Sequence, residues 1–144
     1  MKTKSLPSLF ILLALAVFGS VSSARAQSVS VFASPSTITN AGDESQLTFV
    51  LSSPSPRDIL VKLMTSGSAA PGGDYVLFGT NLTSDGRVWI PAGETSANIY
   101  LHAFADGDPP NTSEVAKITI LRNRRYQIGS PSSATVTIDN VDTK

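Results

Sequence analysis

The sequence predicts an all-β protein: one antiparallel β-sandwich of about seven strands that follows an export signal. Beyond residue 26 it has no long apolar stripe with the 3.6-residue period of an amphipathic helix. Short alternating runs rich in Val, Ile, Thr, Phe and Tyr recur instead, separated by Gly, Pro, Ser, Thr or Asn. Evenly spaced runs of this kind are typical of sandwiches and barrels.

The N-terminal residues have the three parts of a cleavable signal peptide. Lys2 and Lys4 precede ten apolar residues, Leu9 to Phe18, and small residues then lead to Ala24-Arg25-Ala26. Ten residues rise only about 15 Å as a helix, roughly half of a bilayer core, so we expect no stable membrane anchor. We expect cleavage after Ala26 and a secreted or periplasmic protein. The two expected segments are a signal peptide, 1–26, and one domain, 27–144.

Charge and cysteine content exclude several classes of function. Without the three basic residues of the signal, 8 basic residues face 11 acidic ones, a net charge of −3. Nucleic acid is therefore not an expected partner. The absence of cysteine excludes disulfides, thiol nucleophiles and thiolate metal sites.

The first two predicted strands lie on either side of a proline. The first covers 28–33, stops at Pro35 and continues briefly at 37–38, because proline cannot donate to a strand ladder. The second covers 45–52, where apolar and polar residues alternate. Its apolar face is Leu47, Phe49 and Leu51.

The third and fourth predicted strands have weaker patterns. A run of Ile, Leu, Val and Met predicts the third over 59–65. The fourth begins at Tyr75 and resumes at 87–90. Between these two parts, 81–86 is unpatterned, and we expect a bulge or a flexible excursion there.

The last three predicted strands alternate clearly over 96–105, 115–122 and 133–138. Alternation means that one face of each strand is buried and the other is solvated. Two packed antiparallel sheets have this requirement, so the predicted architecture is a sandwich.

Strand direction gathers most acidic residues at one end of this sandwich. If the strands alternate, the first, third and fifth connections and the segment after the last strand share one end. Eight of the 11 acidic residues fall there: Asp43, Glu44, Asp74, Asp106, Asp108, Glu114, Asp139 and Asp142. Only Lys144 is basic at that end, whereas Arg57, Arg122, Arg124 and Arg125 fall at the other.

Crowded carboxylates repel each other, and a hard dication relieves that repulsion. Calcium takes six to eight oxygen ligands and tolerates irregular geometry, so four adjacent acidic segments suit it. The alternative is that Asp and Asn occupy these loops only because turns favour them.

Several short motifs, in order along nearly the whole domain, resemble a Calx-beta domain. They are 31–35 with Asn40-Ala41-Gly42, Gly73-Asp74-Tyr75, 90–96, 106–114, 126–129 and 133–140. The resemblance implies an immunoglobulin-like sandwich whose acidic end loops bind calcium in some members, notably sodium–calcium exchangers. Other members are extracellular or adhesive modules. By position, the calcium ligands that the resemblance implies are Asp74, Asp106, Glu114, Asp139 and Asp142, with Asp108 as a weaker match.

Three departures from the family pattern predict weak binding. Asn40 stands where the family commonly has Glu, Gly107 interrupts an Asp-Asp pair, and Asn140 with Val141 dilutes the closing acidic run. Fewer charged ligands weaken a calcium site. We therefore expect a dissociation constant of about 10⁻⁴ to 10⁻³ M, as in extracellular modules.

Other candidate features have competing interpretations. His102 is the only histidine and lies in mid-strand without a nucleophile-elbow motif, so we expect no enzyme. The arginine run 122–125 suits a sulfated or acidic glycan, but it is also typical of a solvated loop. Trp89 and Tyr100 form a sugar platform if exposed, or else pack in the core.

These observations predict an exported, non-enzymatic module that binds calcium weakly and serves adhesion or surface interaction. The alternative is a metal-free sandwich that binds a protein or glycan partner.

Overall fold

The computed structural model describes residues 26–141, and all regular structure in that range is β-strand. The strands are β1 (Ser28–Ser34), β2 (Thr37–Thr39), β3 (Glu44–Leu51), β4 (Ile59–Val61), β5 (Leu63–Ser66), β6 (Tyr75–Phe78), β7 (Val88–Ile90), β8 (Ser96–Ala103), β9 (Ser113–Ile120), β10 (Gln127–Ile128) and β11 (Ser133–Asp139). The predicted all-β class is confirmed.

Apart from Ala26, the predicted signal peptide lies outside the described residues, and so does Asp142. Within 26–141, no helix has the length and apolar character needed to cross a membrane.

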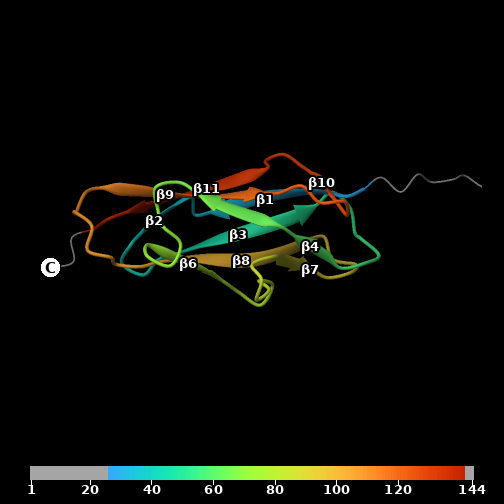
Figure 1. The fold of residues 1–144 in the computed structure, drawn as a ribbon, viewed down its shortest axis with the longest axis horizontal. Helices are drawn as coiled ribbons and strands as arrows, with labels where there is room; N and C mark the ends of the chain where they lie inside the picture. Colours follow the sequence, from blue (N-terminus) through green and yellow to red (C-terminus); the bar gives the residue numbers. More distant parts are fainter. Residues whose placement is uncertain (1–25, 142–144) are drawn as a thin grey trace, which may run out of the picture.

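The long strands run along the main axis of an elongated domain (Figure 1). One sheet has the order β10-β1-β3-β8-β6, and the other has the order β2-β11-β9-β5. Pairing is antiparallel except for β1 with β10 and β2 with β11. The first predicted strand therefore changes sheets at Pro35, since β1 and β2 belong to different sheets.

Two predicted strands are broken. The strand expected over 59–65 divides at Lys62 into β4, which pairs with β7, and β5, which pairs with β9. The strand expected from Tyr75 divides into β6, which pairs with β8, and β7. As a result, β4 and β7 form a separate two-stranded ladder. Strand β10 was not predicted.

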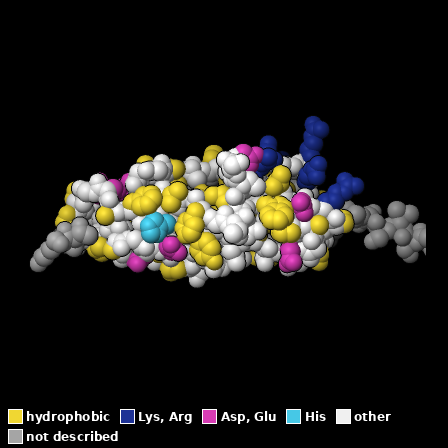
Figure 2. All heavy atoms as spheres, turned by 90° about the horizontal axis from the view of Figure 1, so that it is seen from below, with side chains coloured by type: hydrophobic (Ala, Val, Ile, Leu, Met, Phe, Trp, Pro, Cys, Tyr) yellow, Lys and Arg dark blue, Asp and Glu magenta, His cyan; other side chains and the backbone are white. Residues whose placement is uncertain are grey.

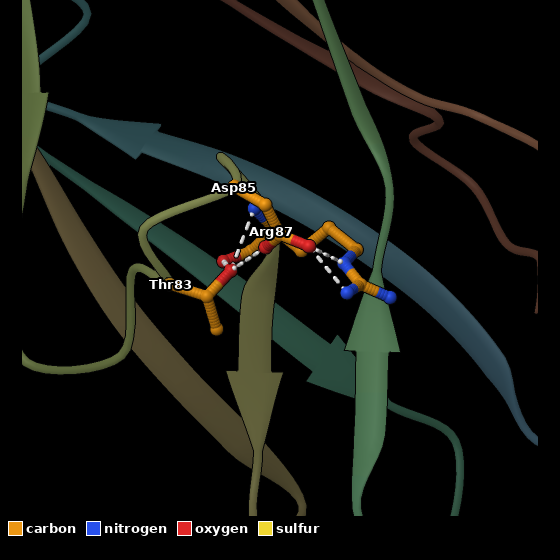
Figure 3. Close-up of polar contacts among 3 residues, drawn as sticks. All are labelled: Thr83, Asp85 and Arg87. Atoms are coloured by element: carbon orange, nitrogen blue, oxygen red, sulfur yellow. Dashed lines mark hydrogen bonds and ion pairs between the residues drawn. The ribbon is translucent and has the colours of Figure 1, made fainter.

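The connection between β6 and β7, where the sequence predicts a bulge or a flexible excursion, is a turn held by hydrogen bonds. Thr83 Oγ1 donates to Asp85 Oδ1 at 2.5 Å, and Arg87 Nε donates to Asp85 Oδ2 at 2.8 Å (Figure 3). These contacts, that of Arg87 first, lower the pKa of Asp85 to about 2. Asn81 Nδ2 also donates to Trp89 O at 3.1 Å, which closes the base of the turn.

The inner faces of the sheets form one hydrophobic core. Alternation on β3 and β8 is as predicted, since Leu47, Phe49, Ile99 and Leu101 are fully buried. Each side chain of this size contributes roughly 1.5–3 kcal/mol when buried. Trp89 is 38% exposed, which decides against its placement in the core.

Backbone hydrogen bonds join four segments at one end, as strand direction predicts. From donor to acceptor they are Ala103 N to Asp43 O at 3.0 Å, Phe104 N to Asp74 O at 2.8 Å, Asn40 N to Asp139 O at 3.1 Å and Asn140 N to Thr112 O at 2.8 Å. None of the described Lys and Arg residues lies in these segments. We define the acidic end by its described carboxylates, Asp43, Glu44, Asp74, Asp106, Asp108, Glu114 and Asp139.

Candidate metal centre

Three carboxylates converge at the acidic end. One oxygen each from Asp74, Asp106 and Glu114 lies within 4.8 Å of the others. Asp74 belongs to the β5–β6 connection and Asp106 to the β8–β9 connection, while Glu114 lies near the start of β9. We call these three residues the carboxylate triad.

A tight turn fixes Asp74. Its Oδ2 accepts a hydrogen bond from Ala70 N at 2.6 Å, and its own N–H donates to Ala70 O at 2.9 Å. Gly72, which donates to Tyr75 O at 2.7 Å, has φ of +83°, a conformation that favours glycine. Asp74 O also accepts from Phe104 N, two residues before Asp106. The backbone therefore sets the distance between the two aspartates.

A second local turn holds Asp106. Asp108 N donates to Asp106 Oδ1 at 3.0 Å, across Gly107 with its φ of +88°. This bond, together with a weaker contribution from Asp74, lowers the pKa of Asp106. Asp106 is therefore ionised at neutral pH.

Glu114 has the most perturbed carboxyl group of the acidic end. Its Oε2 is buried and has no hydrogen-bond donor among the described residues. Burial first, and then the charges of Asp74, Asp108 and Asp106, raise the pKa of Glu114 to about 7. Ionised Glu114 thus lies beside other negative charges with no donor to offset them.

The triad fits a calcium ion. Calcium–oxygen distances are about 2.3–2.6 Å, so two ligand oxygens on one ion lie at most about 5 Å apart. The three oxygens meet that limit. A buried oxygen without a donor, as in Glu114, also calls for a positive partner. Since calcium takes six to eight ligands, carbonyl, amide or water oxygens must complete the shell.

The other three predicted ligands have different positions. Asp108 lies close enough for its charge to raise the pKa of Glu114, and its N–H caps Asp106. Asp139 Oδ1 accepts from Ser113 Oγ at 2.7 Å, across the β9–β11 pair. Asp142 lies outside the described residues. The structure therefore groups three of the six candidates and keeps Asp108 beside them.

Two asparagines hold the acidic segments together. Asn40 is 5% exposed, and its Oδ1 accepts from Val141 N at 3.1 Å. Asn140 is 3% exposed, and its Nδ2 donates to Thr112 Oγ1 at 2.9 Å. Two of the departures from the family pattern therefore serve as structural links, a role that local sequence signals did not indicate.

His102 lies on the outer face of β8 beside Glu44, with Nδ1 3.4 Å from Oε1. Strand pairing places them directly opposite each other, a contact that register alone could have revealed. A hollow of about 310 Å³ adjoins His102, and its lining includes Asn40, Gly42 and Phe104 but no Ser, Thr or Cys. A carboxylate partner for a catalytic histidine is present there, but a nucleophile is not.

Comparison with solved structures identifies a similar fold. The structure of the apo-form Calx CBD1 domain matches with a TM-score of 0.56 and 21% identity, over 79% of this chain and 98% of that chain. CBD12 from CALX1.2 matches with a TM-score of 0.55 and 20% identity, over 77% of this chain. The match spans 44% of that second, longer chain. No protein-family model and no curated protein matches the sequence. The fold is therefore Calx-beta-like.

Proposed function

We propose that this chain is an exported, non-enzymatic Calx-beta-like module whose acidic end binds calcium weakly. The observation that carries the proposal is the carboxylate triad, with its oxygens within 4.8 Å of one another and a buried Glu114 oxygen without a donor. The Calx-beta-like fold supports it, because acidic end loops bind calcium in some members of the family that the sequence resembles.

The chain's own residues would hold the ion, and the ion would supply the missing positive charge. Two turns orient Asp74 and Asp106, and β9 brings Glu114 to within 4.8 Å of both. Because Glu114 retains a proton up to about pH 7, binding must displace that proton, and affinity should rise with pH. Calcium would thereby stiffen the joined loops, and we propose that this stiffened end serves adhesion or surface interaction.

Thermal unfolding of the purified protein in EDTA and in millimolar calcium tests the proposal. Calcium at 100 times its dissociation constant should stabilise the fold by about 2.7 kcal/mol, which raises the melting temperature by several degrees. Magnesium should have a smaller effect, because it requires stricter octahedral geometry. An unchanged midpoint in calcium would remove the ion from the function.

Export is tested separately by the N-terminus of the mature protein. Mass spectrometry of protein collected outside the cytoplasm should give Gln27 as the first residue. An intact Met1 in that fraction would contradict cleavage at the proposed site.

A row of aromatic rings, of which Phe78 is exposed and Tyr100, His102 and Phe104 are half-buried, favours the metal-free interaction module as the second candidate. The ring centroids of Phe78 and Tyr100 lie 5.5 Å apart with the rings tilted, and those of His102 and Phe104 lie 5.3 Å apart with the rings edge to face. Phe78 is 40% exposed, so the row can receive a sugar ring or an apolar protein surface. This function would be favoured if the protein bound a sugar or protein partner without calcium and if Phe78→Ala abolished that binding. Trp89 is exposed, as the platform predicted from Trp89 and Tyr100 requires, and the ring that Tyr100 contacts is that of Phe78.

A further inference from the structure

Arginines gather at the end of the sandwich opposite the triad. Arg57 lies in the β3–β4 connection, and Arg122, Arg124 and Arg125 lie in the β9–β10 connection. All four side chains are exposed. Figure 2 shows Lys and Arg side chains gathered toward one end of the molecule. We call these four residues the basic end.

None of the four guanidinium groups has a counter-ion among the residues that the structure describes. Among residues 26–141, ion pairs within 4.0 Å join only Arg87 with Asp85 and His102 with Glu44. Asp58 follows Arg57 directly, but its Oδ1 accepts from Ala92 N at 2.9 Å. The positive charge of the basic end therefore remains available to a partner.

The loop that carries three of these arginines is firmly anchored. The hydroxyl of buried Tyr126 donates to Leu121 O at 2.7 Å, and the Tyr126 hydroxyl oxygen accepts a hydrogen bond from Lys62 N at 2.9 Å. Further along, Gln127 N and Gly129 N donate to backbone oxygens of the first strand region at 2.8 and 2.7 Å. An anchored loop loses little conformational entropy when a ligand binds it.

Two hollows flank this loop, and each contains arginine. One, of about 370 Å³, is lined by Arg122, Tyr126 and Ile128 among others. The other, of about 390 Å³, includes Arg57, Arg125 and Ser55. Cavities of this size suit small ligand units, and both combine apolar and polar side chains as a sugar ring requires.

We propose that the basic end is a docking surface for an anionic polysaccharide that carries sulfate or carboxylate groups on successive sugars. Guanidinium groups bind such anions through paired N–H donors. Two adjacent arginine-containing hollows suit a chain with repeated charges better than a single small anion. The acidic end repels the same polymer, so binding is confined to one end. This function is independent of calcium.

Binding of the purified protein to immobilised heparin and polygalacturonate tests the proposal, with neutral dextran as the blank. We expect retention on at least one anionic polymer that decreases as salt screens the charges. The triple variant Arg122→Gln, Arg124→Gln, Arg125→Gln should bind about tenfold more weakly or worse, whereas the matched control Lys117→Gln, on an exposed strand position, should bind as the parent does. EDTA should leave retention on the anionic polymers unchanged. A failure of polysaccharide binding can therefore be distinguished from a failure of calcium binding.

Several results would overturn the proposal. One is retention no greater than on dextran at low salt, and another is an unchanged triple variant whose melting temperature equals that of the parent. If the protein bound double-stranded DNA or phosphatidylglycerol vesicles as tightly as the anionic polysaccharides, the basic end would be a surface for polyanions in general. Salt-sensitive self-association in sedimentation, without retention on either polymer, would assign the surface to a second copy of the chain.

Discussion

The two ends of the sandwich are both built from loops between strands, yet they hold their charges in opposite ways. At the acidic end, the residues of the triad lie in turns and near the start of a strand, and their carboxylate oxygens are within 4.8 Å of one another. At the basic end, the β9–β10 loop is anchored by Tyr126, but the arginine side chains extend into solvent.

This difference shows how side-chain length decides what a charged loop can recognise. The carboxylate of an aspartate is so close to the backbone that a turn fixes its position, which suits a small ion. An arginine side chain has about 2 kcal/mol of rotamer entropy, so its charge covers a wider area even on a fixed loop. Such a surface suits an extended partner that makes several contacts.

The largest expected effect separates the triad from the other carboxylates of the acidic end. Glu114→Gln should remove most of the calcium-induced stabilisation, about 2.7 kcal/mol at saturation, because it removes the charge of the buried ligand. Asp139→Asn should retain most of it, since Asp139 is bound to Ser113. Melting curves with calcium and with EDTA measure both variants, and equal loss in both would contradict the placement of the site.

The next largest effect concerns the anchor of the basic end. Tyr126→Phe removes the acceptor of Lys62 N and the donor to Leu121 O, so it should destabilise the fold by about 1–3 kcal/mol in urea unfolding. The calcium-induced shift should stay at its parental size, because the hydroxyl of Tyr126 bonds to no residue of the acidic end. Tyr100→Phe is the control, as its hydroxyl makes no such link among the described residues. A reduced calcium shift in Tyr126→Phe would show that the ends are coupled.

A smaller effect follows from the pKa of Glu114, which is about 7 against an ordinary value of 4.5. The folded state holds this proton more tightly than the unfolded state does. Its contribution to stability is therefore complete below pH 4.5 and is lost as pH rises through about 7. Solvent screens this partly exposed carboxyl group, so in EDTA we expect the free energy of unfolding to decline by only roughly 1 kcal/mol across this window. Urea unfolding at each pH measures the decline. Glu114→Gln should flatten the curve, and an equal slope in that variant would refute the assignment.

The smallest effect is expected between the two ends. Lys117 is exposed near the middle of β9 and lies in neither charged region. Lys117→Gln should change the free energy of unfolding by less than about 0.5 kcal/mol, as surface substitutions usually do. A larger change in urea unfolding would mean that charge placement matters along the whole body of the domain.

Much of the fold could be predicted, because β3, β8, β9 and β11 have one buried and one solvated face. The break at Lys62 could not, since it arises where one strand passes from a pair with β7 to a pair with β9. The short strand β10 has only two residues, and its parallel pairing with β1 joins segments far apart in the sequence, which no local pattern indicates.

For the candidate site, strand direction predicts which segments meet but not which side chains face one another. The gathering of Asp74, Asp106 and Glu114 follows from alternating strands plus local turns. The hydrogen bond that engages Asp139 and the links made by Asn40 depend on contacts between distant segments. Patterns of neighbouring residues contain no information on such contacts.

The course of the first and last long strands has a mechanical consequence. Strands β1 and β11 both run from the basic end to the acidic end, so the chain enters the domain at one end and leaves it at the other (Figure 1). Inter-strand hydrogen bonds lie across the strand direction. Tension applied through Ala26 and Val141 would therefore load the ladders of β1 and β11 in shear, and many bonds would share the force before any one of them broke. A module tethered at both ends would resist stretching for this reason.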